Sequence, residues 1–230
     1  MKTVVVRNID RADADAVRRL GALGVSTVHE ACGRAGLMKP YMRPIWAGGE
    51  VAGTAVTVLV HPGDNWMIHV AVEQCRAGDV LVVGCSADNT DGMFGDLLAT
   101  SLKARGVLGL VIDAGCRDVK TLREMGFPVW SKAISAKGTV KAALGAVNVP
   151  VVCAGINVEP GDAVVADDDG VVVVRRKDVA EVAAKGEKRQ ADEEGKRKLL
   201  ASGALGLDMY NMREPLAKAG LTYTDRPESD

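Results

Sequence analysis

Two small groups of chemically capable residues lie at the ends of one segment in the middle of the chain. Gly95 and Asp96 open the segment GDLLATSLKARGVLGLVIDAGCRD, and Arg117 and Asp118 close it. A guanidinium offers a fixed cationic fork to a carboxylate or to a developing enolate oxygen. A carboxylate is a hard oxygen ligand of the kind that Mg²⁺ accepts. These residue types favour a site that grips a small 2-oxo acid beside a divalent cation.

Both groups are expected where one structural element ends and the next begins. Residues 96–105 predict a helix, whose free N–H groups in the first turn and positive dipole end form a site for a small anion. Residues 108–113 predict a strand that leads into a second helix over 117–125. Ligands commonly bind at the carboxyl ends of strands in open α/β folds. We therefore expect Arg117 and Asp118 to face the anion site.

The same residues also allow a purely structural interpretation. Asp96 fits a helix N-cap, and Arg117 with Asp118 fits a solvated pair at a helix start. Two alternatives stay open for Glu30 in the segment VHEA. It is either a residue of the site or part of a capping box Thr27-x-x-Glu30, in which its carboxylate satisfies a backbone donor.

Other polar motifs favour structure over chemistry. The run DDDG at 167–170 lies between two valine-rich stretches, where Asp and Gly favour a hairpin turn over a metal cluster. His61 and His69 have no third ligand at metal spacing. No GxGxxG or GxxxxGK[ST] pattern occurs, so the sequence does not support a nucleotide-binding fold.

The elements expected before the site begin with helices. Asp10 is expected to cap a helix that ends at Gly24, and a second short helix is expected over 26–32. Residues 51–60, VAGTAVTVLV, predict a strand, followed by a helix through Cys75 that Asp64 or Asn65 caps. A further strand is expected over 79–83. This alternation of strands and helices predicts a layered α/β domain.

The second half of the chain has a different texture. After Pro128, short apolar runs such as VPVVCAG and DAVVADDDGVVVV, separated by Gly, Pro and Asp, predict antiparallel strands. From 177 to 200 charged residues and alanine predict a long helix, interrupted at Gly186 and Gly195. A helix this polar is expected to project from the body.

Composition narrows the class of protein. Hydrophobic residues make up 47% and charged residues 26%, as in an ordinary globular protein, and the net charge is −1. No basic cluster favours nucleic acid or an anionic membrane as a partner. Five scattered cysteines without a CxxC pair favour reduced thiols, and no apolar run approaches the ~20 residues of a membrane span. We therefore expect a cytoplasmic protein.

The spacing of the two groups resembles a known signature. Asp96, twenty intervening residues and Arg117-Asp118 reproduce the D-x20-R-D pattern of the pyruvate aldolases related to the regulator of ribonuclease E activity A. Four further segments are similar to the 4-hydroxy-4-methyl-2-oxoglutarate / 4-carboxy-4-hydroxy-2-oxoadipate aldolases, so the likeness covers nearly the whole chain. These segments are VHEACGRAGLMKPYMRPI, HPGDNWMIHVA, GDLLAT and LGLDMYNMREPLAKAG.

The resemblance implies roles for individual residues. Asp118 would be the direct ligand of Mg²⁺, for which Mn²⁺ or Co²⁺ could substitute, and Asp96 would hold a metal-bound water. Arg117 would meet the substrate oxygen, with Asp96 and Glu30 as further catalytic residues. Backbone N–H groups would take the pyruvate carboxylate at Leu97 and Leu98. The substrate-binding residues so implied are Gly95, Asp96, Leu97, Leu98 and Arg117.

The resemblance also implies a shared site. Glu193, or Glu194 as the alternative, would reach the metal waters of a neighbouring subunit in a trimer or hexamer. The fold implied is a layered β/β/α sandwich, similar to swivelling domains, with the projecting C-terminal helix. Residues 1–230 would form a single aldolase domain in which 177–230 are a helical extension packing on a neighbouring subunit.

The activity implied is cleavage of 4-hydroxy-4-methyl-2-oxoglutarate to two pyruvates and of 4-carboxy-4-hydroxy-2-oxoadipate to pyruvate and oxaloacetate. Oxaloacetate decarboxylation is the expected side activity. One alternative is a Schiff-base aldolase that uses Lys132. Another is a non-catalytic regulator of ribonuclease E. The sequence does not fix the preferred 4-hydroxy-2-oxo acid, the physiological metal or the general base.

Overall fold

The computed structural model describes residues 3–225 of the 230-residue chain. The chain divides into two compact units, Met1–Glu187 and Lys188–Asp230. The first unit carries the sheet and the two junctions between elements that hold the candidate residues. The first junction is Gly95 and Asp96, and the second is Arg117 and Asp118. The organisation as one aldolase domain, with 177–230 packing on a neighbouring subunit, stays a prediction, and 226–230 of that extension lie outside the described residues.

One large sheet forms the centre of the first unit. Its middle consists of four parallel strands in the order β3, β4, β6, β7, with β8 and β1 beyond β3 and with β2 beyond β7. The bounds are β1 Val4–Val5, β2 Arg43–Pro44, β3 Val51–Val60, β4 Asp79–Cys85, β6 Gly109–Cys116, β7 Val129–Ile134 and β8 Ala146–Val147. β-Branched residues dominate β3 and β4, which are buried along almost their whole length.

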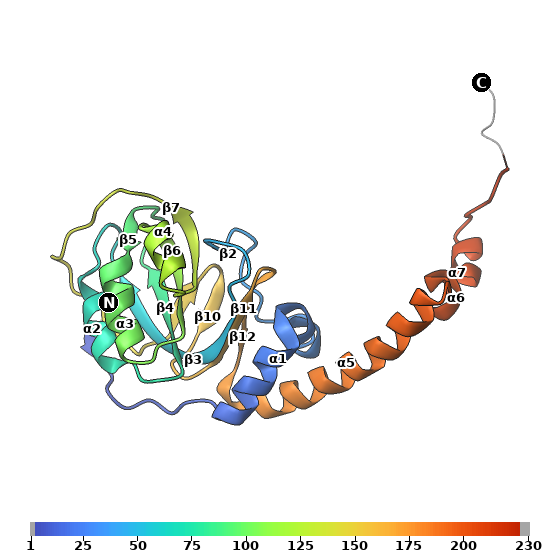
Figure 1. Ribbon diagram of the computed structural model, residues 1–230, viewed down its shortest axis with the longest axis horizontal. Coiled ribbons are helices and arrows are strands. Elements are labelled where there is room, and N and C mark those ends of the chain that lie inside the picture. The colour runs from blue at the N-terminus through green and yellow to red at the C-terminus, as the bar shows by residue number, and fades with distance from the viewer. Residues whose placement is uncertain (1–2, 226–230) are drawn as a thin grey trace, which may run out of the picture. The chain divides into compact units, whose positions relative to one another are not determined.

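Three helices cover one face of this sheet, as Figure 1 shows. They are α2 (Trp66–Gln74), α3 (Asp96–Ala104) and α4 (Val119–Glu124). Their apolar side chains form one core with the inward residues of β4 and β6, among them Leu81 and Ile112. The alternating strands and helices predicted from the sequence are therefore observed.

The opposite face of the sheet is covered by more β structure. The hairpin of β11 (Ala163–Asp167) and β12 (Gly170–Val174) pairs with β3, and β9 (Val151–Cys153) pairs with β10 (Ile156–Val158) in a separate two-stranded sheet. Trp130 and the side chains of β4 and β6 on this second face of the sheet pack against these strands in a second core. The layered β/β/α arrangement predicted for the fold is confirmed.

Helix α1 (Ala14–Ala31) packs on the outer side of the β11–β12 hairpin. It contains a kink at Gly24, whose φ of 76° lies in the left-handed region, so the predicted break at this glycine is observed inside one assigned helix. The predicted cap was wrong by three residues, because Asp13 rather than Asp10 accepts the N–H of Ala16, at 2.9 Å.

The acidic run at 167–170 forms the turn of the β11–β12 hairpin, with Asp167 opposite Gly170. The Asp167 carboxylate accepts the N–H of Val25 at 2.8 Å and so satisfies a donor just after the kink of α1. Asp169 accepts the hydroxyl of Ser26 at 2.6 Å. The hairpin turn predicted for this run is therefore confirmed.

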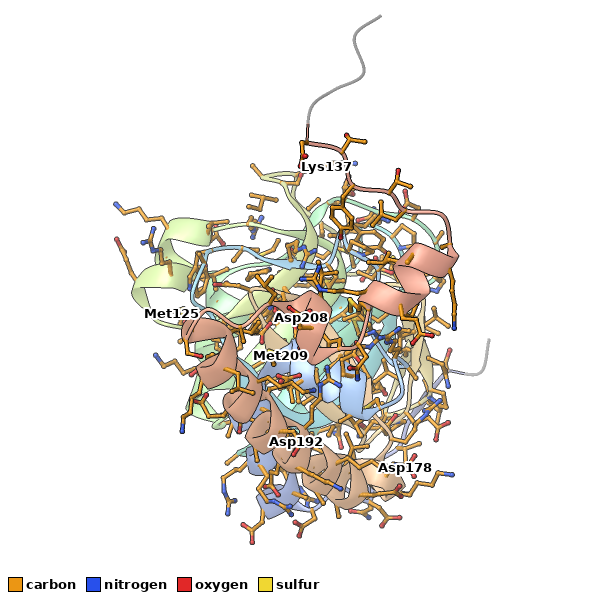
Figure 2. The ribbon with its side chains drawn as sticks, turned by 90° about the vertical axis from the view of Figure 1, so that its right-hand side faces the viewer. Met125, Lys137, Asp178, Asp192, Asp208 and Met209 are labelled. Atoms are coloured by element: carbon orange, nitrogen blue, oxygen red, sulfur yellow. The ribbon has the colours of Figure 1, made fainter. Side chains whose placement is uncertain are left out.

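A long charged helix, α5 (Val179–Ala201), follows a short 3₁₀ helix at Arg176–Asp178. It runs unbroken through Gly186 and Gly195, so the predicted interruptions are wrong. A Cβ on Gly186 would lie 2.4 Å from Cδ1 of Leu23, so this glycine allows α5 to approach α1. Figure 2 labels Asp192 on α5 and Asp208 on α6 (Gly206–Met209), which precedes α7 (Arg213–Lys218). None of the helices in residues 3–225 has the length and apolarity to cross a membrane.

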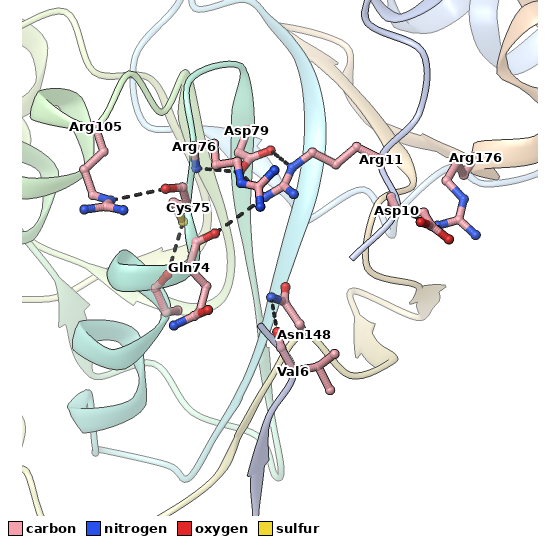
Figure 3. A network of polar contacts seen from close by, with 11 residues as sticks. Val6, Asp10, Arg11, Gln74, Cys75, Arg76, Asp79, Arg105, Asn148 and Arg176 are labelled. Carbon is pink, nitrogen blue, oxygen red and sulfur yellow. Dashed lines mark hydrogen bonds and ion pairs between the residues drawn. The ribbon is translucent and has the colours of Figure 1, made fainter. Parts of the chain in front are cut away.

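A partly buried ion pair ties the N-terminal segment to the sheet (Figure 3). Arg11 donates two hydrogen bonds to Asp79 at the start of β4, at 2.8 and 2.9 Å. Asp79 is 1% exposed and also accepts the N–H of Arg76 at 2.7 Å. The hydrogen bonding of Arg11 to the Asp79 carboxylate raises the pKa of the Arg11 guanidinium. This ion pair fixes the segment before α1 to the sheet, and each of its two charges is neutralised by the other.

Candidate active site

The two junctions predicted to face each other are neighbours in the structure. The short strand β5 (Gly92–Phe94) pairs in parallel with the last residues of β6, with Phe94 opposite Cys116. The backbone N–H of Arg117 donates to the carbonyl of Phe94 at 2.9 Å. Because α3 follows β5 and α4 follows β6, the N-termini of both helices lie at the same edge of the sheet.

Asp118 holds the end of the second junction in an uncommon conformation. It is the N-cap of α4, with φ 60° and ψ 33° in the left-handed region, which Asp and Asn tolerate better than most residues. The left-handed conformation typically costs a residue other than glycine roughly 1–3 kcal/mol, and such residues cluster at functional sites. Here the conformation turns the carboxylate back toward the first junction.

The carboxylate of Asp118 is held by the start of α3. The backbone N–H of Asp96 donates to its Oδ2 at 3.2 Å. A Cβ on Gly95 would lie 2.2 Å from the same oxygen, so only glycine leaves room for the carboxylate. The side chain of Asp118 stays 36% exposed, which leaves oxygen lone pairs open to a ligand.

Arg117 lies beside this carboxylate. Its Nε is 3.6 Å from Oδ2 of Asp118, and its side chain is 44% exposed. On its other side a Cβ built on Gly92 would lie 3.3 Å from Cβ of Arg117, and Gly138 faces its terminal nitrogen. The guanidinium is therefore supported along its stem while its head remains open to a substrate.

The first turn of α3 presents backbone donors at the same place. The carboxylate of Asp96 accepts the N–H of Leu97, at 2.8 Å. The Leu98 N–H belongs to the same first turn, whose donors have no carbonyl one turn earlier. The Leu97 side chain is 80% exposed. A substrate carboxylate on the Leu97 N–H would therefore displace the Asp96 side chain, a role that stays a prediction.

The site has a wall that sequence reasoning missed. Residues 135–138 follow β7, and the carbonyl of Lys137 accepts the N–H of Gly92 at 2.9 Å. The Lys137 ammonium pairs with Asp91 at 2.9 Å, and this hydrogen bond lowers the pKa of Asp91. The glycines Gly92 and Gly138 are visible in the sequence as possible sites of close approach. The tertiary structure is needed to show that both lie beside Arg117.

Glu30 and Glu193 lie on other elements. Glu30 is near the end of α1, 3.1 Å from Nε of Arg34, and lines a cavity of about 650 Å³ with residues of α5. Thr27 follows the kink at Gly24 within α1, so the predicted capping box stays a prediction. Glu193 lies in the second unit and pairs with Arg189 at 2.8 Å. The roles predicted for both glutamates at the site stay predictions.

Lys132 lies on β7 with two partners. Its ammonium pairs with Asp88 and lies 5.2 Å from the centroid of the Tyr41 ring. Cys116, next to Arg117, is buried, and burial raises the pKa of its thiol to about 12. Lys132 is therefore paired and the Cys116 thiol is neutral, whereas Asp96, Arg117 and Asp118 are partly exposed.

The donor set at the two junctions suits a magnesium ion. In residues 3–225 no three His, Cys, Asp or Glu side chains form a complete metal site. Asp118 and Asp96 offer hard oxygens, and Mg²⁺ usually takes one or two carboxylates while keeping several waters. Gly95 leaves room for the Asp118 carboxylate, and the Asp96 N–H orients it. The residues present therefore fit a partly hydrated ion.

Comparison with known proteins places the chain in a family. The family described as RraA-like: Aldolase/RraA matches residues 12–173. The chain belongs to the RraA-like family, as the D-x20-R-D spacing predicted. A protein from Halalkalibacterium halodurans provisionally named 4-hydroxy-4-methyl-2-oxoglutarate aldolase is 27% identical over 202 residues, which cover 88% of this chain and 96% of that protein.

Further relatives carry both kinds of name. A Burkholderia multivorans protein with the same provisional aldolase name is 34% identical over 62% of this chain and 87% of its own length. The crystal structure of Streptomyces coelicolor RraAS2, described as an unusual member of the RNase ES inhibitor RraA protein family, has 29% identity and a TM-score of 0.74. It covers 83% of this chain and 99% of that chain.

Proposed function

We propose that this protein is a divalent-metal-dependent pyruvate aldolase that cleaves 4-hydroxy-2-oxo diacids. The observation that carries the proposal is the meeting of Asp96, Arg117 and Asp118 at two adjacent helix starts, with the Asp96 N–H 3.2 Å from Oδ2 of Asp118. A guanidinium, carboxylates and the backbone N–H groups of a helix start are groups that bind a 2-oxo acid and its metal ion. The provisional aldolase names of two relatives support the same activity.

Asp118 would hold Mg²⁺ directly, and Asp96 would hold one of its waters. When bound, the ion supplies Lewis-acid stabilisation for the negative charge that develops on the 2-oxo group of the substrate. Mn²⁺ or Co²⁺ suits the same oxygen donors. The remaining chemistry falls to the residues of the chain.

Arg117 would stabilise the charge that appears during cleavage. Loss of the proton from the 4-hydroxyl group forms a carbonyl at C4, the C3–C4 bond breaks, and its electron pair moves through C3 to the oxygen at C2. The resulting pyruvate enolate then takes a proton at C3. A preorganised donor at the developing oxyanion is typically worth about 3–4 kcal/mol. We propose a water beside Arg117 as the base for the 4-hydroxyl proton.

The Leu97 and Leu98 N–H groups would hold the pyruvate carboxylate at the positive end of α3. This anchoring would leave C3 and C4 toward solvent and toward the wall at 135–138. The substrates proposed are 4-hydroxy-4-methyl-2-oxoglutarate and 4-carboxy-4-hydroxy-2-oxoadipate. Oxaloacetate is the proposed side substrate, because its decarboxylation passes through the same enolate.

We also propose that the site is completed by a second copy of the chain in a trimer or hexamer. Glu193, or Glu194, would approach the metal waters from the neighbouring subunit. In support, this chain alone offers two carboxylates at the two junctions, and α5 carries both glutamates in a strongly charged helix.

A pyruvate-release assay on metal-stripped protein tests the activity. Titration with Mg²⁺ should restore cleavage of both proposed diacids, and EDTA should abolish it. Pyruvate release that persists in EDTA but is lost after borohydride treatment with pyruvate would establish a Schiff base at Lys132 instead. The engagement of Lys132 by Asp88 and Tyr41 favours the metal mechanism.

Regulation of a ribonuclease by protein contact is the second candidate, because the Streptomyces coelicolor neighbour is described as belonging to an RNase inhibitor family. That chain aligns almost whole with 83% of this one, so this chain carries sequence beyond the shared fold. Inhibition of ribonuclease E by protein that releases no pyruvate, with or without Mg²⁺, would favour this function.

A further inference from the structure

Strand β6 changes neighbours just before it delivers Arg117. It pairs with β4 as far as Ile112, opposite Val83, and with β5 from Gly115 onward. On its other edge Ile112 pairs with Ser131 and Gly115 with Ala133, so two residues of β6, Asp113 and Ala114, oppose the single residue between them on β7. This is a β-bulge, a feature that re-aims side chains next to active sites.

The bulge needs an anchor because it interrupts the hydrogen bonds of the sheet. A Cβ on Gly115 would lie 2.2 Å from the carbonyl oxygen of Thr90, so the strand runs tightly under the loop that leads to β5. Arg117 and Asp118 follow two and three residues later. A small rotation of the backbone at Asp113 would therefore be carried to both side chains.

Asp113 supplies such an anchor on the other layer of the fold. Its Oδ1 accepts the hydroxyl of Tyr41 at 3.0 Å, and its Oδ2 accepts the N–H of Ala154 at 2.8 Å. Both carboxylate oxygens are thus tied to segments outside the large sheet. Ala154 itself has φ 46°, so the chain that offers this donor also adopts an uncommon conformation.

Tyr41 is in turn positioned by the strand that opposes the bulge. Lys132 of β7 lies over its ring at 5.2 Å from the centroid and pairs with Asp88 in the connection between β4 and β5. Burial, together with the Asp113 hydrogen bond, raises the pKa of Tyr41, so its hydroxyl stays a donor across the neutral range. The network therefore joins β6, β7 and the loop before β5 at one point.

We propose that Tyr41 and Asp113 are positioning residues that fix the bulge of β6 and thereby the aim of Arg117 and Asp118. This inference rests on the proposed function and deepens it. It also gives Lys132 a role through the Tyr41 ring. The phenol of Tyr41 is suited to a test, because the residue is 38% exposed and contributes its hydroxyl rather than a core side chain.

Tyr41→Phe removes one oxygen and tests the proposal directly. We expect kcat for 4-hydroxy-4-methyl-2-oxoglutarate to fall about tenfold with KM changed less than about twofold, because misplaced groups lower turnover more than ground-state binding. The dissociation constant for Mn²⁺, read by electron paramagnetic resonance without substrate, should rise several-fold. The matched control is Tyr210→Phe, another partly exposed tyrosine with a lysine over its ring, at 5.6 Å, which should leave both quantities unchanged.

Asp113→Asn provides a second arm and a test of coupling. It should lower kcat and Mn²⁺ affinity in the same direction, and adding Tyr41→Phe to it should have little further effect, since Tyr41 acts through its hydrogen bond to Asp113. If Asp113→Asn does not fold, Tyr41→Phe alone decides. Unchanged kcat and Mn²⁺ affinity in Tyr41→Phe, with active wild-type protein, overturn the proposal. A lowered melting temperature with unchanged Mn²⁺ affinity overturns it too.

The proposed function and the positioning role of Tyr41 and Asp113 can fail independently. Wild-type protein that releases no pyruvate in Mg²⁺ contradicts the proposed function, whereas Mn²⁺ binding by wild type and variants still reports on the positioning pair. Active wild-type protein with a silent Tyr41→Phe variant contradicts only the positioning pair.

Discussion

The backbone N–H of Asp96 lies 3.2 Å from Oδ2 of Asp118, across two junctions whose residues are twenty-two positions apart. This bond joins the start of one helix to the cap of the next. A carboxylate held by a single backbone donor is oriented yet keeps lone pairs for another ligand.

Gly95→Ala should remove metal binding while the fold persists. The added Cβ would lie 2.2 Å from Oδ2 of Asp118, so the carboxylate must swing away. Gly95 has extended backbone angles that alanine adopts without strain. We expect at least a tenfold weaker Mn²⁺ affinity by electron paramagnetic resonance. Gly49→Ala, whose Cβ meets only ordinary contacts from 3.5 Å outward, is the control, and equal Mn²⁺ affinities in the two variants would contradict the prediction.

Arg117→Ala should lower kcat a few hundredfold, as expected for loss of about 3–4 kcal/mol of transition-state stabilisation. Arg123→Ala removes an exposed arginine from the same helix region and should leave kcat unchanged. Steady-state kinetics of pyruvate release measure both. A drop shared equally by the two variants would point to lost net charge rather than to a placed guanidinium.

Asp118→Asn should abolish Mg²⁺-dependent cleavage without unfolding the protein. Asparagine tolerates the left-handed conformation at φ 60° as well as aspartate does, so the turn into α4 should survive. Circular dichroism should show a melting temperature close to that of the wild type. Cleavage that still responds to Mg²⁺ in this variant would exclude Asp118 as the direct ligand.

Cys116 should resist alkylation in the folded protein. Burial raises the pKa of its thiol from 9.0 to about 12, so at pH 8 it remains a neutral thiol. The stabilising contribution of this group is full below pH 9 and is lost as the pH rises toward about 12, because only the unfolded chain ionises early in that range. Iodoacetamide labelling followed by mass spectrometry should modify Cys116 only in denaturant.

Asp79→Ala should destabilise the fold by about 3–5 kcal/mol, since it leaves the Arg11 charge without its partner in a largely buried place. Urea denaturation measures the change in the free energy of unfolding. Asp15→Ala, which removes an exposed ion pair with Arg18, should change that free energy by less than about 1 kcal/mol. Similar losses of unfolding free energy in both variants would mean that the Arg11–Asp79 pair stabilises the fold no more than an exposed pair does.

Much of the local structure could be predicted from the sequence. The β-branched run at 51–60 and the spacing of Asp96 from Arg117-Asp118 carry their information locally, so the strand, the helix starts and the family followed from them. The hairpin at 167–170 followed from turn chemistry in the same way.

Long-range contacts could not be predicted. Asp13 rather than Asp10 caps α1, and cap positions shift easily because several acidic residues there are equivalent in sequence. The pairing of β5 with β6, which brings Gly92 and the wall at 135–138 to Arg117, is a tertiary contact with no local signature. Gly186 reads as a helix breaker, yet packing against Leu23 makes a glycine the best fit inside α5.

Within the described residues, the short strand β5 pairs with the last residues of β6, beyond the part of β6 that pairs with β4. Insertions or deletions in the connection between Cys85 and Gly92 would therefore reshape one side of the reaction chamber and leave the paired central strands undisturbed. A scaffold built in this way separates the residues that keep the protein folded from those that would select the proposed substrate, so changes in that connection could alter specificity without a loss of architecture.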